Sequence, residues 1–152
     1  MDRHLATLAA LVLAASSCSS GDSATTVTTT PALSAKFDGT TWTATSVFAT
    51  LATGGYLSVT ASGPGIGTFT FALIANAPGT FSIGPTSPVT TTYTLLSSTW
   101  SATTTNGSGS VTITSFTTNS ASGTFNFLVP AVTTTAATGY KAISAGTFTV
   151  TF

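Results

Sequence analysis

Few side chains in this sequence could carry out acid, base or nucleophilic chemistry. Residues 36–152 contain three charged side chains, Lys36, Asp38 and Lys141, and no glutamate, arginine, histidine or cysteine. Paired catalytic carboxylates need two acids and a serine triad needs a histidine, so composition excludes both. Ser144 follows Lys141 by three residues, but that spacing on a strand directs the two side chains to opposite faces. We therefore expect no enzyme activity and no catalytic residue.

The same inventory bears on cofactors and on charged partners. Metal sites are built from histidine, cysteine or clustered carboxylates, so we expect neither a metal nor a cofactor. Two lysines against one aspartate leave the segment almost neutral, which predicts no binding of nucleic acid. Asp38 precedes Gly39, and because Asp-Gly favours a tight hairpin turn we interpret Asp38 as a turn residue.

The one residue with distinctive chemistry is the single cysteine, Cys18, which follows an apolar run over residues 5–15. That run is too short for a membrane-spanning helix, which needs about 20 residues, and its length is typical of a secretory signal. The four residues Ala15–Cys18 resemble the lipobox of bacterial lipoproteins. The resemblance implies that residues 1–17 are a signal peptide and that Cys18 carries the lipid. Two alternatives remain: simple secretion, because Ala15 and Ser17 also suit ordinary signal peptidase, and a buried N-terminal helix.

The lipobox interpretation places the protein in the bacterial cell envelope, held to a membrane through its N-terminal lipid, with secretion as the alternative. After Cys18 the sequence is rich in serine, threonine and glycine as far as Ala35. Such a composition cannot bury enough apolar surface to become ordered, so residues 18–35 are interpreted as a flexible linker. A first strand over residues 26–30 is the alternative.

Residues 36–152 alternate apolar and hydroxyl side chains with a period of two. At the C-terminus, for example, Phe148 and Val150 alternate with Thr147 and Thr149. Turn signals such as Asp-Gly, Gly-Pro-Gly and Asn-Gly separate these segments. The pattern predicts one all-β domain, an antiparallel β-sandwich or barrel of about ten strands, preceded by a signal helix and a disordered tether.

The expected strands and core follow from the phase of the alternation. Strands are expected near residues 35–38, 41–49, 56–61, 65–75, 79–83, 91–96, 99–104, 109–117, 121–129 and 142–152. The expected core consists of Phe37, Trp42, Leu57, Val59, Phe69, Phe71, Phe81, Ile83, Tyr93, Val111, Ile113, Phe125, Phe127, Phe148, Val150 and Phe152.

The tripeptide Gly-Thr-Phe occurs four times, beginning at Gly67, Gly79, Gly123 and Gly146. The intervals are unequal, so the tripeptide is not the period of a solenoid. We interpret it as a shared strand entry, in which glycine permits the bend out of a turn and phenylalanine enters the core.

Four stretches of the domain resemble a known group of sequences. They are the segments 36–44 (KFDGTTWTA), 109–114 (GSVTIT), 122–127 (SGTFNF) and 145–152 (AGTFTVTF). Together they resemble a group of uncharacterised bacterial lipoprotein domains, in which a lipobox signal precedes a single β-domain of unknown function. The resemblance implies an anchored β-domain and no catalytic residue.

The expected function is a binding or structural role in the cell envelope, with an envelope protein or glycan as the partner; the sequence does not define the oligomeric state. One alternative is a carbohydrate-binding module in which Trp100, Tyr56 and Tyr140 stack on sugar rings, provided that these rings lie on one face. Another is a water-ordering or ice-binding surface formed by Thr-x-Thr triplets such as residues 68–70 and 147–149.

Overall fold

A computed structural model describes residues 30–152, apart from the side chains of residues 87 and 88. The signal peptide predicted for residues 1–17, the lipid at Cys18 and the linker up to residue 29 lie outside the described residues. Within the described range the chain contains strands and turns, and none of it forms a helix that could cross a membrane.

The domain is all-β, as its alternating sequence predicts. Its strands are β1 (Ala32–Phe37), β2 (Thr40–Thr43), β3 (Ser46–Ala52), β4 (Tyr56–Gly63), β5 (Ile66–Ile74), β6 (Gly79–Gly84), β7 (Ser87–Pro88), β8 (Thr90–Leu95), β9 (Ser98–Ala102), β10 (Ser108–Phe116), β11 (Ser120–Pro130) and β12 (Tyr140–Thr151).

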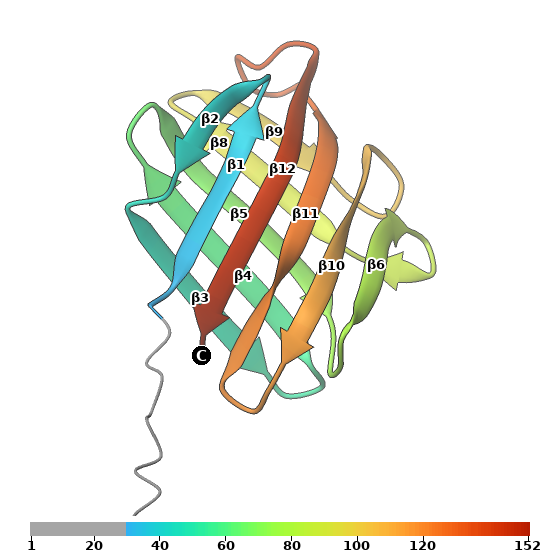
Figure 1. Ribbon diagram of the computed structural model, residues 1–152. Helices are drawn as coiled ribbons and strands as arrows, with labels where there is room; N and C mark the ends of the chain where they lie inside the picture. The colour runs from blue at the N-terminus through green and yellow to red at the C-terminus, as the bar shows by residue number, and fades with distance from the viewer. Residues whose placement is uncertain (1–29) are drawn as a thin grey trace, which may run out of the picture.

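The strands form two antiparallel sheets that pack face to face, and their strand directions cross in Figure 1. One sheet has the order β2-β1-β12-β11-β10-β6-β7 and the other has the order β3-β4-β5-β8-β9. Each sheet ends in free edges instead of closing on itself, so the domain is a sandwich and not a barrel. In the seven-stranded sheet, β1 is not an edge strand, because it pairs with β2 on one side and with β12, the last strand of the chain, on the other.

The ordered domain begins earlier than the sequence boundary at residue 36. β1 starts at Ala32, and it pairs with β12 from Ala32 opposite Thr149. Leu33 and Ala35 are buried in phase with Phe37, so the alternation already extends into the segment assigned to the linker. The assignment of residues 32–35 to a flexible linker is therefore wrong, because these residues complete the inner face of β1.

A second correction concerns the single strand expected over residues 41–49. The structure divides this segment into β2, in one sheet, and β3, in the other, with the crossing at residues 44 and 45. Trp42 is buried at an even position, whereas Ala49 is buried at an odd position. This change of phase in the alternation is what a chain shows when it leaves one sheet for the opposite one.

The core lies between the sheets and contains most of the predicted residues. Phe69 and Phe71 are fully buried at its centre, with the Phe125 ring centroid 5.3 Å from each of theirs. Phe81, Ile83 and Phe152 are only partly buried, since two lie on β6 near a sheet edge and the third follows the end of β12. The large buried side chains that the expected core lacks include Leu33, Leu73, Val89, Trp100, Val129 and Ile143.

Two of the Gly-Thr-Phe tripeptides pair with each other across β11 and β12. Gly123 lies opposite Phe148, and Phe125 lies opposite Gly146. A methyl group added to Gly146 would lie 2.6 Å from Phe125 Cζ, which is closer than packed atoms approach. Gly146 therefore leaves room for the ring of the opposite strand, whereas a Cβ at Gly123 would first meet the Thr112 carbonyl oxygen of β10 and then Phe148 Cε1 at 3.0 Å. The strand-entry interpretation holds for Gly79, at the start of β6, and is wrong for the pair on β11 and β12.

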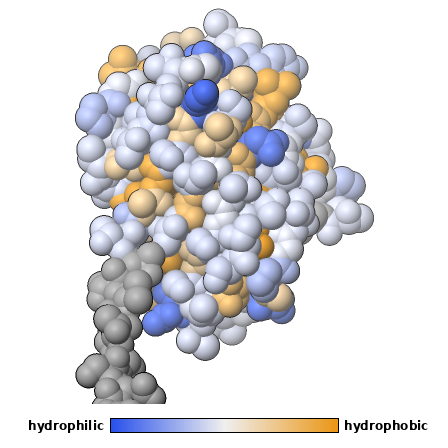
Figure 2. Space-filling model, viewed as in Figure 1, coloured by the Kyte–Doolittle hydropathy of each residue, from blue (hydrophilic) through white to orange (hydrophobic). Residues whose placement is uncertain are grey.

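Hydroxyl side chains form rows across the outer faces of both sheets. One row crosses six strands through the paired residues Thr43, Ser34, Thr147, Thr124, Thr112 and Thr80. A row on the other sheet consists of Ser46, Ser62, Thr68, Thr94 and Thr99. Figure 2 shows the face of the seven-stranded sheet, on which most residues are of intermediate hydropathy and few are strongly hydrophilic. The outer faces of the sheets thus interact with water mainly through hydroxyl groups and carry few charged side chains.

Candidate functional site

A cleft of about 360 Å³ opens at the end of the sandwich where β1 turns into β2. Both sheets contribute to it: the β1–β2 hairpin and β12 from one sheet, the β4–β5 turn and β8 from the other. The residues that line it are Phe37, Asp38, Thr40, Thr41, Trp42, Pro64, Gly65, Ile66, Tyr93, Leu95 and Lys141. It therefore contains two of the three charged side chains of residues 30–152.

Asp38 occupies the turn position that its sequence predicts. Asp38 and Gly39 have φ angles of 48° and 84°, the left-handed values that a type I′ hairpin turn requires at both central residues. The Asp38 amide donates to the Ala142 carbonyl at 2.8 Å, and Asp38 Oδ1 accepts a hydrogen bond from the Ala142 amide at 3.0 Å. The aspartate thus attaches the β1–β2 turn to the beginning of β12.

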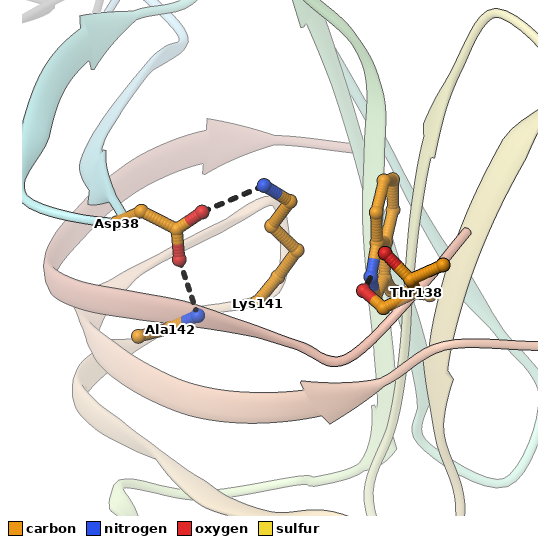
Figure 3. A network of polar contacts seen from close by, with 5 residues as sticks. Asp38, Thr138, Lys141 and Ala142 are labelled. Atoms are coloured by element: carbon orange, nitrogen blue, oxygen red, sulfur yellow. Dashed lines mark hydrogen bonds and ion pairs between the residues drawn. The ribbon is translucent and has the colours of Figure 1, made fainter.

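The second oxygen of the aspartate makes an ion pair with Lys141 (Figure 3). Lys141 Nζ donates to Asp38 Oδ2 at 2.6 Å, and both side chains remain partly exposed. This hydrogen bond lowers the pKa of the Asp38 carboxyl below its usual value of 3.8, against partial burial that acts to raise it, and the Ala142 amide contributes further. The carboxyl is therefore ionised and paired at neutral pH.

Lys141 also connects the two sheets through an aromatic stack. Its ammonium group lies 5.0 Å from the centroid of Trp100, and the Trp100 ring stacks on Tyr93 at 5.3 Å with an interplanar angle of 24°. Trp100 Nε1 donates to the Thr138 carbonyl at 3.2 Å. Burial raises the pKa of the Tyr93 phenol, which is thus neutral at physiological pH. The Asp38–Lys141 ion pair consequently lies beside the stacked rings of Trp100 and Tyr93, which form an aromatic wall of the site.

One polar atom at the cleft has no partner. Trp42 lines the cleft and is 6% exposed, and its Nε1 is the single buried side-chain donor or acceptor in the described part of the chain that lacks a hydrogen bond. A Cβ atom on Gly63 would lie 3.1 Å from Nε1, so the indole edge lies against the strand that leads into the β4–β5 turn. A buried donor without an acceptor destabilises a fold by about 1–3 kcal/mol.

The charged groups of the cleft are paired with each other. Its aspartate and lysine neutralise each other, and among residues 30–152 neither is hydrogen-bonded to a serine, threonine or tyrosine hydroxyl that it could activate. Within residues 30–152 no group of three or more histidine, cysteine, aspartate or glutamate side chains could hold a metal ion. Hydroxyl groups of Thr40 and Thr41 and the partly exposed ion pair are the polar contacts that a ligand would meet.

The three rings proposed to stack on a sugar do not share a face. Trp100 is 7% exposed and belongs to the core, because its strand phase points it at Tyr93. Tyr140 is exposed beside Lys141 at the cleft end. Tyr56 is exposed at the start of β4, whose other end, Gly63, leads into the cleft. The prediction of a common stacking platform from these residues is therefore wrong.

The fold and site define a class: an all-β sandwich with an end cleft that carries an ion pair on an aromatic wall. Residues 29–150 match the model of a family described as a domain of unknown function, DUF6252, and the chain belongs to this family. The match begins just before β1 and ends within β12, so the family comprises the whole sandwich. No curated protein and no solved structure matches the chain.

Proposed function

We propose that this protein is a non-catalytic, lipid-anchored component of the bacterial cell envelope whose sandwich acts as a binding or structural module. The observation that carries the proposal is the placement of the cleft relative to the start of the domain. The chain enters β1 at Ala32, opposite Thr149, and reaches the cleft at Phe37, opposite Ile143. At about 3.3 Å per residue, β1 separates the two ends by roughly 17 Å.

This geometry supports a module that is held at one end and binds at the other. Figure 1 shows that the chain enters the domain at the end where β12 finishes, whereas the β1–β2 hairpin lies at the opposite end. A lipid on Cys18 would tether the domain through its entry end, so the attachment would leave the cleft at the opposite end unobstructed. A partner in the envelope, either a protein or a glycan, would then approach the cleft without crossing the lipid surface.

The anchor is tested by substitution of Cys18 in the full-length protein. We expect the parent to partition into detergent and to gain the mass of a diacylglyceryl group with its acyl chains, whereas Cys18→Ala should lose both properties. Ser19→Ala is the matched control and should behave as the parent. Equal membrane association of Cys18→Ala and the parent would refute the lipid anchor.

The cleft is tested by blocking its mouth. Thr40 is exposed in the β1–β2 hairpin and lines the cleft, so Thr40→Trp should fill the mouth without disturbing the core. Thr114→Trp, at an exposed position on β10 outside the cleft, is the matched control. An envelope component that the parent and Thr114→Trp retain but Thr40→Trp loses identifies the partner of the cleft. Retention by all three proteins would place binding elsewhere.

A second candidate function, a water-ordering surface, is favoured by the hydroxyl row that crosses six strands. Ser34 and Thr147 lie 3.0 Å apart through their hydroxyl oxygens, as do Thr80 and Thr112, so neighbouring hydroxyl groups within the row are hydrogen-bonded at two places. The twist of the sheet limits how much of the row can face a flat surface. Inhibition of ice recrystallisation that disappears in Thr124→Lys would support this candidate, and its absence from the parent would eliminate it.

A further inference from the structure

The four edges of the two sheets are protected to very different degrees. An unprotected edge strand presents free backbone N–H and C=O groups to any other strand. In the seven-stranded sheet, the edge strands β2 and β7 contain four and two residues, and β7 includes Pro88. In the five-stranded sheet, one edge is β9 and the other is β3.

The β9 edge is covered by the loop that precedes β12. Trp100 forms an isolated antiparallel bridge with Ala131, and the Val132 amide donates to the Thr99 carbonyl at 2.9 Å. The Ala136 amide donates to the Ser97 carbonyl at 3.2 Å. This loop occupies backbone groups that a further strand would need.

β3 has none of these protections. It is seven residues long, it pairs with β4 on one side, and on its other side it pairs with no strand among residues 30–152. It contains no charged residue and no proline, which are the residues that usually protect an edge. Phe48 is 66% exposed on its outer face, which makes it one of the most exposed large apolar side chains described.

The sequence of β3 is complementary to itself in antiparallel pairing. With Ala49 opposite Ala49 of a second copy, Val47 lies opposite Leu51 and Phe48 lies opposite Thr50. Val47 and Leu51 are partly buried against the core, so pairing would extend the apolar layer from one copy into the next. The two Phe48 rings would lie diagonally on one face, within reach of each other. The absence of charge removes the repulsion that would otherwise oppose a two-fold contact.

We propose that the free edge of β3 is a dimerisation site, at which a second copy of this chain pairs antiparallel to form a continuous ten-stranded sheet from two five-stranded sheets. We choose a second copy as the partner for two reasons. In antiparallel pairing about Ala49, the inward-facing apolar residues of one β3 lie opposite those of the other, and neither strand carries a charge that would repel its partner. The dimer would present two clefts, one in each copy.

The test uses the full-length lipidated protein in density-matched detergent and measures its mass by sedimentation equilibrium over about a hundredfold range of concentration. The parent should show a monomer–dimer equilibrium. Phe48→Lys should raise the dimer dissociation constant by at least about tenfold, because it places two like charges near each other and protects the edge. Leu128→Lys, an exposed apolar position on β11 in the other sheet, is the matched control and should dimerise as the parent does.

Thr50→Lys is a second variant at an exposed site of the same edge, and near-ultraviolet circular dichroism confirms that each variant is folded. Hydrogen exchange at those amides of residues 47–51 that point away from β4 should slow as the parent concentration rises. A parent that is monomeric at every concentration overturns the proposal. Slow, concentration-independent exchange at those amides of residues 47–51 that point away from β4 also overturns it, because another segment of the same chain would then cover the free edge of β3. A dimer that survives both lysine substitutions places the interface elsewhere and likewise overturns it.

Discussion

Replacing Gly146 by alanine tests whether the paired glycines of β11 and β12 make room for the opposite rings. The added Cβ would lie 2.5 Å from Phe125 Cδ2 and 2.6 Å from Phe125 Cζ. Phe125 is 2% exposed and packs against Phe69 and Phe71 at 5.3 Å, so its ring has no free space into which to move. Overpacking of this kind destabilises a core by about 1–3 kcal/mol.

Gly79→Ala provides the matched control from the same tripeptide. A Cβ at Gly79 would meet only the ring of Phe81, at 3.6 Å, which is an ordinary contact, and Gly79 has no positive φ. Its free energy of unfolding should change by no more than about 0.5 kcal/mol.

The assay is unfolding in urea, followed by tryptophan fluorescence. With a slope of about 2 kcal/mol per molar urea, a loss of about 2 kcal/mol lowers the midpoint by roughly 1 M. Adding Phe125→Leu to Gly146→Ala should relieve the clash, with a coupling energy of at least about 0.5 kcal/mol in the double-mutant cycle. Equal midpoints for Gly146→Ala and Gly79→Ala would show that the ring does not require a glycine opposite it.

Two further predictions concern the core and the ion pair. Phe148→Ala should lower the free energy of unfolding by about 3–5 kcal/mol and Thr149→Ala by less than about 1 kcal/mol, because Phe148 is buried and Thr149 faces outward; equal losses in urea unfolding would mean that both faces of β12 are buried. Since pairing lowers the pKa of Asp38, its stabilising contribution is present above about pH 4 and is lost as the pH falls through the lowered value. Asp38→Asn, which still suits a turn residue with positive φ, should remove this part of the acid dependence of the urea midpoint, and an unchanged dependence would exclude the ion pair as its source.

The sequence predicted the fold class and most of the core because period-two alternation directly records which face of a strand is buried. The residues that the prediction misplaced lie where the alternation of apolar and hydroxyl side chains is short or changes phase. Leu33 and Ala35 continue the phase of Phe37 but stand in a polar, threonine-rich segment, whose composition outweighed the pattern. The separation of β2 from β3 is visible only as a change of phase between Trp42 and Ala49, without glycine or proline between them.

The candidate site was less accessible to sequence reasoning, because it depends on pairings between residues far apart in the chain. Asp38 was recognisable as a turn residue, but Lys141 stands 103 positions later, and only the antiparallel register of β1 and β12 brings the two together. Trp100 is the middle residue of β9, and its burial follows from pairing with Tyr93, which short-range alternation does not show. The end cleft likewise requires the arrangement of both sheets.

The interior position of β1 determines how the domain responds to mechanical tension. The chain enters the sandwich at Ala32, and β1 is hydrogen-bonded to β2 on one side and to β12 on the other. A pull from the N-terminal side against a partner held at the cleft acts along β1, whereas its ladder hydrogen bonds are perpendicular to the strand. The two ladders are then sheared together, and many bonds must break at once. An edge strand pulled sideways would be peeled away one bond at a time, so the position of β1 between two strands makes its extraction from the sheet difficult.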